Sequence, residues 1–344
     1  MAHGEEFIGL VYGEVDMTKI LVTRHIPSPG IELLQSMASV EVDVFAEDKI
    51  IPRDELLRRV VGIDILVSIL TDKIDAAVMD AAGANLKMIA NYAVGFDNID
   101  VAEAKKRNIV VTNTPTLEVN ESVAEHAIAL IFALAHRVVE TDRYTRDGKY
   151  HGWGPELLLG TDIAGKILGI IGGGAIGSGV ARRMKDGFGV RILYNDLKPN
   201  SKFEEEFGAE YRSKESLLQE SDIVSLHVPL LPSTTHLIDR AALAMMKPTA
   251  FLINTARGPI VDEAALVDAL ERGVIAGAGL DVFEGEPNIA ADPAVADRLR
   301  KLQNVVLTPH TASATISTRS AMSKQVVTNI EEFLAGEVPE NAVK

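Results

Sequence analysis

The feature that most constrains the fold is a glycine-rich turn joining an apolar strand to a helix. An apolar run at 166–171 leads into Gly172, Gly174 and Gly177, and a helical segment is expected at 175–184. In such a turn the first glycine permits tight bending, the second lets the backbone approach a pyrophosphate, and the third lets the helix pack on the strand. The phosphates would meet free N–H groups at the helix N-terminus. Dinucleotide binding is therefore predicted, with these residues in contact: Gly172, Gly174, Ala175, Ile176 and Gly177.

An acidic residue follows the glycines at the spacing that dinucleotide binding requires. Asp196 ends a strand expected at 190–195, about 20 positions beyond the turn. A carboxylate there accepts hydrogen bonds from the ribose hydroxyls of the adenosine and repels a 2′-phosphate. NAD is therefore favoured over NADP, although Lys198 keeps dual use open. With strand, helix and Asp196 all in place, nucleotide binding is favoured over a glycine-rich turn without function.

The length and the order of the expected elements predict two α/β domains. The chain has 344 residues, and domains hold roughly 150 residues. Strands that alternate with helical segments indicate right-handed β-α-β units and parallel, doubly wound sheets. The second series has the six strands of a dinucleotide-binding sheet. The expected strands lie at 20–23, 40–44, 63–69, 87–90 and 109–112, and then at 167–171, 190–194, 223–227, 250–254, 276–280 and 305–307.

Composition argues against several classes of protein. Lys and Arg total 34 against 49 for Asp and Glu, a net charge of -15 that disfavours nucleic acids and anionic membranes as partners. The absence of cysteine excludes disulfides, thiolate metal sites and cysteine nucleophiles. We expect no bound metal. No apolar run reaches the roughly 18 residues of a membrane helix, and the acidic N-terminus lacks a secretory signal. We therefore expect a cytoplasmic protein.

Three polar side chains at neighbouring strand ends predict carbonyl chemistry. Arg257 follows the strand at 250–254, Glu286 lies five residues beyond Asp281, and His310 follows the last strand. The carboxyl ends of parallel strands form the edge where such sheets bind ligands. An arginine offers a planar fork to a carboxylate substrate, and a histidine exchanges protons near neutral pH. A glutamate beside it would fix its tautomer and favour the imidazolium.

These segments together resemble one family. The sequence is similar to the D-isomer-specific 2-hydroxyacid dehydrogenases, and within them to the glyoxylate/hydroxypyruvate reductases, from about Thr18 to the C-terminus. The motifs that carry the resemblance lie at 91–100 (NYAVGFDNID), 112–115, 169–177, 254–258, 279–283, 285–287 and 308–312.

The resemblance implies roles for individual residues. Arg257, Glu286 and His310 would be catalytic, and the amides of Val94 and Gly95 would bind the substrate carboxylate with Leu70 nearby. It also implies a homodimer joined through helices of the nucleotide domain. The loop of Trp153 would then reach the partner's active site, unless that side chain is an interface or core anchor. Further cofactor contacts are implied at Val228 and Pro229 near the adenine, and at Thr255, Ala256, Asp281 and Ala312 near the nicotinamide.

The resulting prediction is a Rossmann-type NAD domain inserted into a flavodoxin-like substrate domain. We expect residues 118–309 to form the NAD domain, 17–117 with 310–344 to form the substrate domain, and 1–16 to be an N-terminal extension. One continuous helix is expected at 122–144 and a closing helix at 317–334.

The expected reaction is reduction of glyoxylate, hydroxypyruvate or a similar small 2-oxo acid by NADH, with His310 as the proton donor. Alternatives are a D-lactate, other D-2-hydroxyacid or phosphoglycerate dehydrogenase. An NAD-sensing corepressor on the same fold also stays open, because such proteins keep the catalytic triad.

Overall fold

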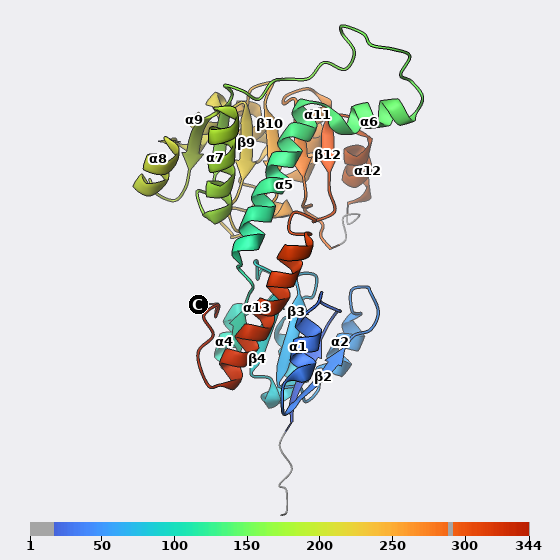
Figure 1. Cartoon of the computed structure of the whole chain (residues 1–344), viewed down its shortest axis with the longest axis vertical. Coiled ribbons are helices and arrows are strands. Elements are labelled where there is room, and N and C mark those ends of the chain that lie inside the picture. The colour runs from blue at the N-terminus through green and yellow to red at the C-terminus, as the bar shows by residue number, and fades with distance from the viewer. Residues whose placement is uncertain (1–16, 288–291, 344) are drawn as a thin grey trace, which may run out of the picture. The chain divides into compact units, whose positions relative to one another are not determined.

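The chain folds into two compact units. The structure, a computed structural model, describes residues 17–287 and 292–343, so the expected extension at 1–16 lies outside the described residues. The first unit comprises the described parts of Met1–Pro115 and Ser320–Lys344, and the second comprises Thr116–Arg319. In each unit helices pack around a sheet of strands (Figure 1). The chain therefore leaves the first unit and later returns to it.

The first unit is built on a five-stranded parallel sheet with the order β2-β1-β3-β4-β5. That is the strand order of flavodoxin-like folds. Four of its strands are mostly buried apolar runs, as expected for a sheet covered on both faces. The edge strand at Val40–Val44 alternates valines with the exposed Glu41 and Asp43. The strands are β1 (Thr18–Val22), β2 (Val40–Val44), β3 (Ile65–Ile69), β4 (Met88–Tyr92) and β5 (Val110–Thr112). The helices are α1 (Gly30–Ser36), α2 (Arg53–Arg59), α3 (Ala76–Ala82), the 3-10 helix η1 (Gly83–Asn85), α4 (Val101–Lys106) and α13 (Ile316–Leu334), which begins in the second unit.

The second unit is built on a seven-stranded parallel sheet with the order β12-β11-β10-β9-β6-β7-β8. The order reverses between β6 and β9, the switch point where doubly wound sheets bind ligands. The strands are β6 (Ile167–Ile171), β7 (Arg191–Asn195), β8 (Glu210–Tyr211), β9 (Ile223–Leu226), β10 (Phe251–Asn254), β11 (Gly277–Leu280) and β12 (Val305–Leu307). The helices are α5 (Leu117–Ala135), α6 (Val138–Arg146), α7 (Ala175–Phe188), α8 (Ser201–Phe207), α9 (Lys214–Glu220), α10 (Arg240–Met245), the 3-10 helix η2 (Gly258–Ile260), α11 (Glu263–Glu271) and α12 (Pro293–Lys301).

The predicted fold class is confirmed, and three details differ. The sheet of the second unit has a seventh strand, β8, whose two residues are too few to give an apolar run. The helix expected at 122–144 is two helices, because Arg137 adopts a left-handed φ of 52° between α5 and α6. The Arg137 guanidinium binds the Glu140 carboxylate (2.8 Å) and the Leu159 carbonyl (3.2 Å) there, which fixes the break.

The second crossing between the units also lies later than predicted, after Arg319 and not near Pro309. The amide of His310 donates to the Asp281 carbonyl (2.8 Å), and Thr318 Oγ1 donates to the Glu118 carbonyl (3.1 Å). Residues 310–319 are thereby tied to the second unit. A proline marks a local break in the chain but does not show which sheet the next loop contacts.

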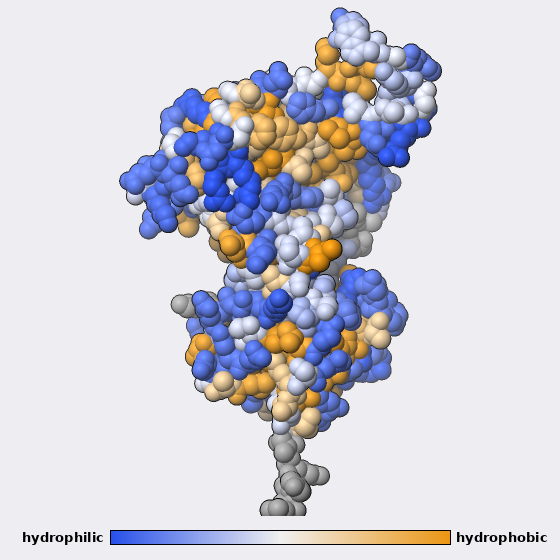
Figure 2. Space-filling view, in the orientation of Figure 1, coloured by the Kyte–Doolittle hydropathy of each residue, from blue (hydrophilic) through white to orange (hydrophobic). Residues whose placement is uncertain are grey.

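The surface of the second unit is mixed. Figure 2 shows mainly hydrophilic side chains over α8 on the face in view. Trp153, in the loop after α6, is 83% exposed, so it is not a core anchor. No single helix in the described ranges is long and apolar enough to span a membrane. Only α5 and α6 together, bent by 60°, meet that test of length and composition.

Candidate active site

The predicted cofactor residues follow successive strands of the second unit. The glycine turn follows β6, Asp196 follows β7, and Val228 and Pro229 follow β9. Thr255 and Ala256 follow β10, and Asp281 follows β11. All are thus placed at the carboxyl edge of one parallel sheet, as the sequence predicted.

The glycine turn has the backbone shape that close phosphate approach requires. Gly172 has a φ of +100°, and a Cβ there would lie 2.5 Å from the His227 carbonyl oxygen. A Cβ on Gly177 would lie 2.2 Å from the Gly172 carbonyl oxygen, so α7 packs directly on the turn. Gly174 is the N-cap of α7, has open space around it, and no side chain caps the helix. Its first-turn amides, including those of Ala175 and Ile176, suit an anionic ligand.

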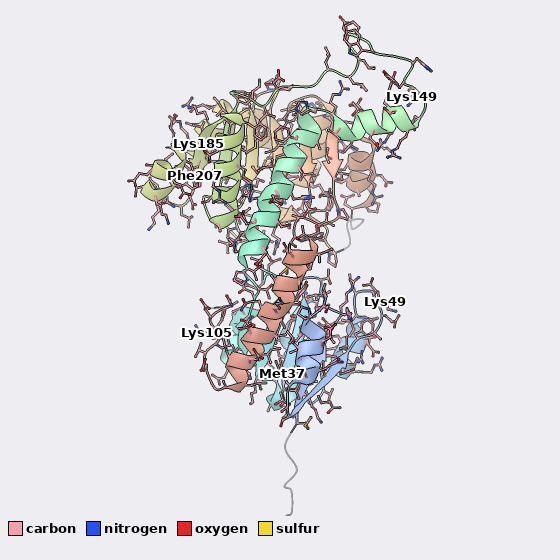
Figure 3. The ribbon with its side chains drawn as sticks, viewed as in Figure 1. Met37, Lys49, Lys105, Lys149, Lys185 and Phe207 are labelled. Carbon is pink, nitrogen blue, oxygen red and sulfur yellow. The ribbon has the colours of Figure 1, made fainter. Side chains whose placement is uncertain are left out.

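Asp196 lies directly beside this turn. Its Oδ2 accepts from the Gly173 amide (2.9 Å), and its Oδ1 accepts from the Leu197 amide (2.7 Å). The carboxylate is therefore held against the glycine turn. Figure 3 labels Lys185 on α7 beside Phe207 at the end of α8, and Lys185 Nζ donates to the Glu206 carbonyl (3.3 Å). This bond joins α7 to the end of α8.

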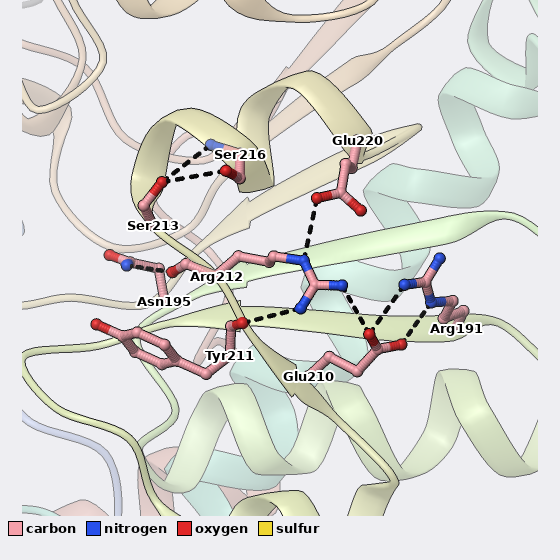
Figure 4. A network of polar contacts seen from close by, with 8 residues as sticks. All are labelled: Arg191, Asn195, Glu210, Tyr211, Arg212, Ser213, Ser216 and Glu220. Atoms are coloured by element: carbon pink, nitrogen blue, oxygen red, sulfur yellow. Dashed lines mark hydrogen bonds and ion pairs between the residues drawn. The ribbon is translucent and has the colours of Figure 1, made fainter.

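A charged network at the sheet edge supports the end of β7 (Figure 4). Glu210 accepts from Arg191 (2.7 Å) and Arg212 (2.7 Å), and these two guanidinium groups lower the pKa of Glu210 to about 2. The Arg212 carbonyl accepts from Asn195 Nδ2 (2.7 Å), one residue before Asp196. The short strand β8, missed from the sequence, therefore helps to place the residue that follows Asn195.

His310 and Glu286 form a pair. His310 Nδ1 lies 2.7 Å from Glu286 Oε2, and the two side chains are 25% and 24% exposed. Glu286 Oε1 accepts from the Phe283 amide (2.8 Å), so both carboxylate oxygens are engaged. Since a carboxylate only accepts hydrogen bonds, Nδ1–H of His310 donates to Glu286, and Nε2 is the nitrogen left to exchange a proton with a substrate. By contrast, burial lowers the pKa of His227 to about 4, so that imidazole is neutral at pH 7.

Asp281 anchors the loop that carries His310. The Asp281 side chain is fully buried; its Oδ1 accepts from Thr308 Oγ1 (2.6 Å) and the Thr311 amide (2.8 Å), and its Oδ2 accepts from the Ala312 amide (2.8 Å). Burial alone would raise the pKa of Asp281, but these donors and His126 on α5 lower it. The sequence placed Asp281 and Ala312 near the nicotinamide. The hydrogen bond between Asp281 and the Ala312 amide also helps to hold the loop of His310, a role that no local sequence pattern indicates.

Arg257 follows β10 in a tightly packed turn. Asn254 Nδ2 donates to the Arg257 carbonyl (2.9 Å), and Asn254 Oδ1 accepts from the Ala256 amide (3.0 Å). A Cβ on the next residue, Gly258, would lie 1.9 Å from the Phe283 carbonyl carbon. The Arg257 turn therefore packs against the loop that carries Glu286. Thr255 Oγ1 is buried without a hydrogen-bond partner among the described residues, and a nicotinamide carboxamide would supply one.

The predicted substrate residues belong to the first unit. Leu70 follows β3, and Val94 and Gly95 follow β4. Asn91 Nδ2 donates to the Gly95 carbonyl (2.9 Å), and Asn113 Nδ2 donates to the Val94 carbonyl (2.7 Å). These two asparagines, which lie in the motifs at 91–100 and 112–115, fix the loop whose amides are expected to bind a carboxylate.

Comparison with known proteins identifies the family. Residues 128–312 match the family model described as D-isomer specific 2-hydroxyacid dehydrogenase, NAD binding domain. A glyoxylate reductase of Korarchaeum cryptofilum is 50% identical over 326 residues, which cover 94% of this chain and 95% of that protein. This chain belongs to the D-isomer-specific 2-hydroxyacid dehydrogenases. It is therefore an oxidoreductase with an NAD-binding domain that acts on CH–OH donors.

Solved structures that are similar to this chain have the same fold. The TT0316 protein of Thermus thermophilus is 43% identical to this dehydrogenase with a TM-score of 0.86, covering 95% of this chain and all of that one. The NADPH-dependent glyoxylate/hydroxypyruvate reductase of Sinorhizobium meliloti, solved with NADP and malonate, is 34% identical with a TM-score of 0.80, covering 94% and 96% of the two chains. The likeness therefore extends over both units of the dehydrogenase.

Proposed function

We propose that this dehydrogenase reduces glyoxylate or hydroxypyruvate to the corresponding 2-hydroxy acid, with His310 as the proton donor. The observation that carries the proposal is the 2.7 Å contact between His310 Nδ1 and Glu286 Oε2, which leaves Nε2 for the substrate oxygen. Support for the substrate comes from the Korarchaeum cryptofilum relative, which is named a glyoxylate reductase. When bound, NADH supplies the hydride that is added to C2 of the 2-oxo acid.

Other residues of the chain would bind the substrate, hold His310 and bind the cofactor. Arg257 would bind the substrate carboxylate and polarise the carbonyl through its planar guanidinium. Glu286 would hold the tautomer of His310 and favour its protonated form before transfer. The backbone amides of Val94 and Gly95 would bind the carboxylate, with Leu70 nearby. The glycine turn would hold the cofactor phosphates, with Val228 and Pro229 near the adenine and Thr255, Ala256, Asp281 and Ala312 near the nicotinamide.

A panel of 2-oxo acids tests this reaction. The purified enzyme is mixed with NADH and, separately, glyoxylate, hydroxypyruvate, pyruvate or 3-phosphohydroxypyruvate, and the loss of NADH absorbance is followed. We expect the highest kcat/KM with glyoxylate or hydroxypyruvate. A preference for pyruvate would support a D-lactate dehydrogenase, and a preference for the phosphorylated acid would support a phosphoglycerate dehydrogenase. No reaction with any of the four would contradict the proposal.

We propose that NADH is preferred over NADPH because Asp196 would repel a 2′-phosphate. Because the Sinorhizobium meliloti enzyme was solved with NADP, the cofactor preference of this enzyme is tested directly. Asp196→Asn keeps an oxygen for the Gly173 amide but removes the charge. The ratio of kcat/KM for NADPH to that for NADH should rise by about tenfold, or roughly 1.4 kcal/mol. Asp186→Asn, an exposed change on α7, is the control and should leave the ratio unaltered. An unchanged ratio in Asp196→Asn would refute the ribose argument.

We also propose a homodimer. The family resemblance implies one, and the loop that follows α6 exposes three large side chains that another chain could cover: Tyr150 (55%), Trp153 (83%) and Leu159 (64%). Sedimentation equilibrium should give twice the mass of one chain, and Trp153→Ser should weaken the association. A monomer at micromolar concentration would contradict the proposed homodimer.

A further inference from the structure

Two glutamates outside the proposed catalytic set join the loops that follow β10 and β11. Glu263 is the first residue of α11, and Glu284 lies two residues before Glu286. The Glu284 amide donates to Glu263 Oε2 (3.0 Å), and the Glu263 amide donates to Glu284 Oε2 (3.2 Å). Each side chain therefore binds the backbone of the other residue. We call this reciprocal pair the glutamate bridge.

The bridge reaches a third loop as well. The other oxygen of Glu284, Oε1, lies 2.6 Å from Nε2 of His236, in the loop after β9. The His236 amide in turn donates to the Pro259 carbonyl (2.8 Å), just before α11. Three consecutive strand ends of the sheet are thus connected through one side chain. Such closed networks hold backbone more firmly than separate bonds do.

The bridge acts directly on the backbone that orients Glu286. The amides of Phe283 and Glu284 are consecutive, and each is bound by a glutamate: the first by Glu286 (2.8 Å) and the second by Glu263 (3.0 Å). Gly258 packs so closely there that a Cβ would lie 2.4 Å from the Glu284 nitrogen. A shift of this short segment would therefore displace Glu286 and, through it, the imidazole of His310.

Burial and the negative charges around Glu263 make the ionised form of its carboxyl group unfavourable. Burial raises the pKa of Glu263, and the negative charges of Glu284, Asp292 and Glu286 raise it further, while the bond from the Glu284 amide lowers it. Groups on neighbouring elements that can carry a positive charge are His236, Arg257 and His310 in loops, and Arg300 on α12, which lines the same pocket as Glu263 and donates to Asp297 (3.1 Å). A carboxylate that is kept among like charges points to a functional role, here one that depends on the length and geometry of the side chain.

We propose that Glu263, through the glutamate bridge, is a positioning residue for proton transfer: it fixes Glu286 and so aims His310 at the substrate. The proposal rests on the proposed roles of His310 and Glu286. Glu263 and Glu284 touch neither the substrate nor the cofactor in this scheme. Their effect is therefore expected on kcat, not on KM or on cofactor binding.

Two substitutions separate the effect of side-chain length at Glu263 from the effect of its charge. Glu263→Asp keeps the charge at the start of α11 but is one methylene too short to reach the Glu284 amide. Glu263→Gln keeps the acceptor oxygen without the charge. We expect Glu263→Asp to lower kcat by about tenfold to a hundredfold, as misplaced groups do, with KM and the Kd of NADH within about twofold. Glu263→Gln should keep most of the wild-type rate.

Glu215→Asp is the matched control, since Glu215 is also an acidic residue in the first turn of a helix, α9, and is exposed. Its kcat should equal that of the wild type. A normal kcat in Glu263→Asp, or equal losses in the Asp and Gln variants, would overturn the proposal. So would a loss accompanied by weakened NADH binding or by a lowered melting temperature.

A double-mutant cycle tests whether Glu263 acts through Glu286. In the Glu286→Gln background, Glu263→Asp should cause less than a twofold further loss, because residues that act through one another are not additive. Full additivity would overturn the proposal. The outcomes also separate the two hypotheses. If His310→Gln keeps full activity, the proposed function fails; if only the Glu263 effect is absent, the function stands and the positioning role fails.

Discussion

Replacing His310 with glutamine is expected to lower kcat for glyoxylate reduction by about 10²- to 10⁴-fold, the contribution of a positioned general acid. Glutamine has nearly the size of histidine and can still donate to Glu286, but it cannot supply a proton to the substrate oxygen. Because the glycine turn and Asp196 are untouched, the Kd of NADH should stay within about twofold. Steady-state rates with NADH and glyoxylate, together with a fluorescence titration of NADH, measure both quantities.

The control is His136→Gln, an exposed histidine directly after α5. It should keep the wild-type kcat and the same NADH affinity. A His310→Gln enzyme that retains more than a tenth of the wild-type kcat would remove His310 from the role of proton donor. Equal weakening of NADH binding would instead indicate that the substitution has disturbed the loop held by Asp281.

Substituting Gly177 with alanine is expected to impair both cofactor binding and stability. The added Cβ would lie 2.2 Å from the Gly172 carbonyl oxygen and 3.2 Å from Ile170 Cγ2, so α7 would have to move away from the turn. Overpacking of this kind costs about 1–3 kcal/mol. Since the moved backbone supplies the phosphate contacts, we expect the Kd of NADH to rise by more than about tenfold. Thermal unfolding and an NADH titration measure the two effects.

Gly187→Ala provides the matched control within the same helix. Nothing lies within 4 Å of a Cβ at Gly187, and its φ is not positive. Alanine is a better helix former than glycine, so this variant should gain roughly 0.5–1 kcal/mol of stability with unchanged NADH affinity. If the two alanine variants bind NADH equally well, close packing of α7 on the turn is not what the cofactor site requires.

Local patterns were sufficient for much of the fold. The strand, the glycine spacing and the following helix predicted β6, the turn and α7, because each depends on residues adjacent in sequence. Patterns failed where contacts between distant residues decide the structure. The break before α6 depends on Arg137 binding Glu140 and the Leu159 carbonyl, and β8 depends on pairing with β7. Neither arrangement leaves an apolar period in the sequence.

By itself, the sequence determined the two parallel α/β domains, the glycine turn with Asp196, and the residues Arg257, Glu286 and His310 at strand ends. Only the tertiary structure decided what holds these side chains in place. The Glu286 contact of His310 was expected, but the anchoring of its loop by Asp281 and the bridge between Glu263 and Glu284 were not. The physical reason is that these carboxylates bind backbone amides of distant residues. Every residue except proline carries such an amide, so the partner has no signature in the sequence.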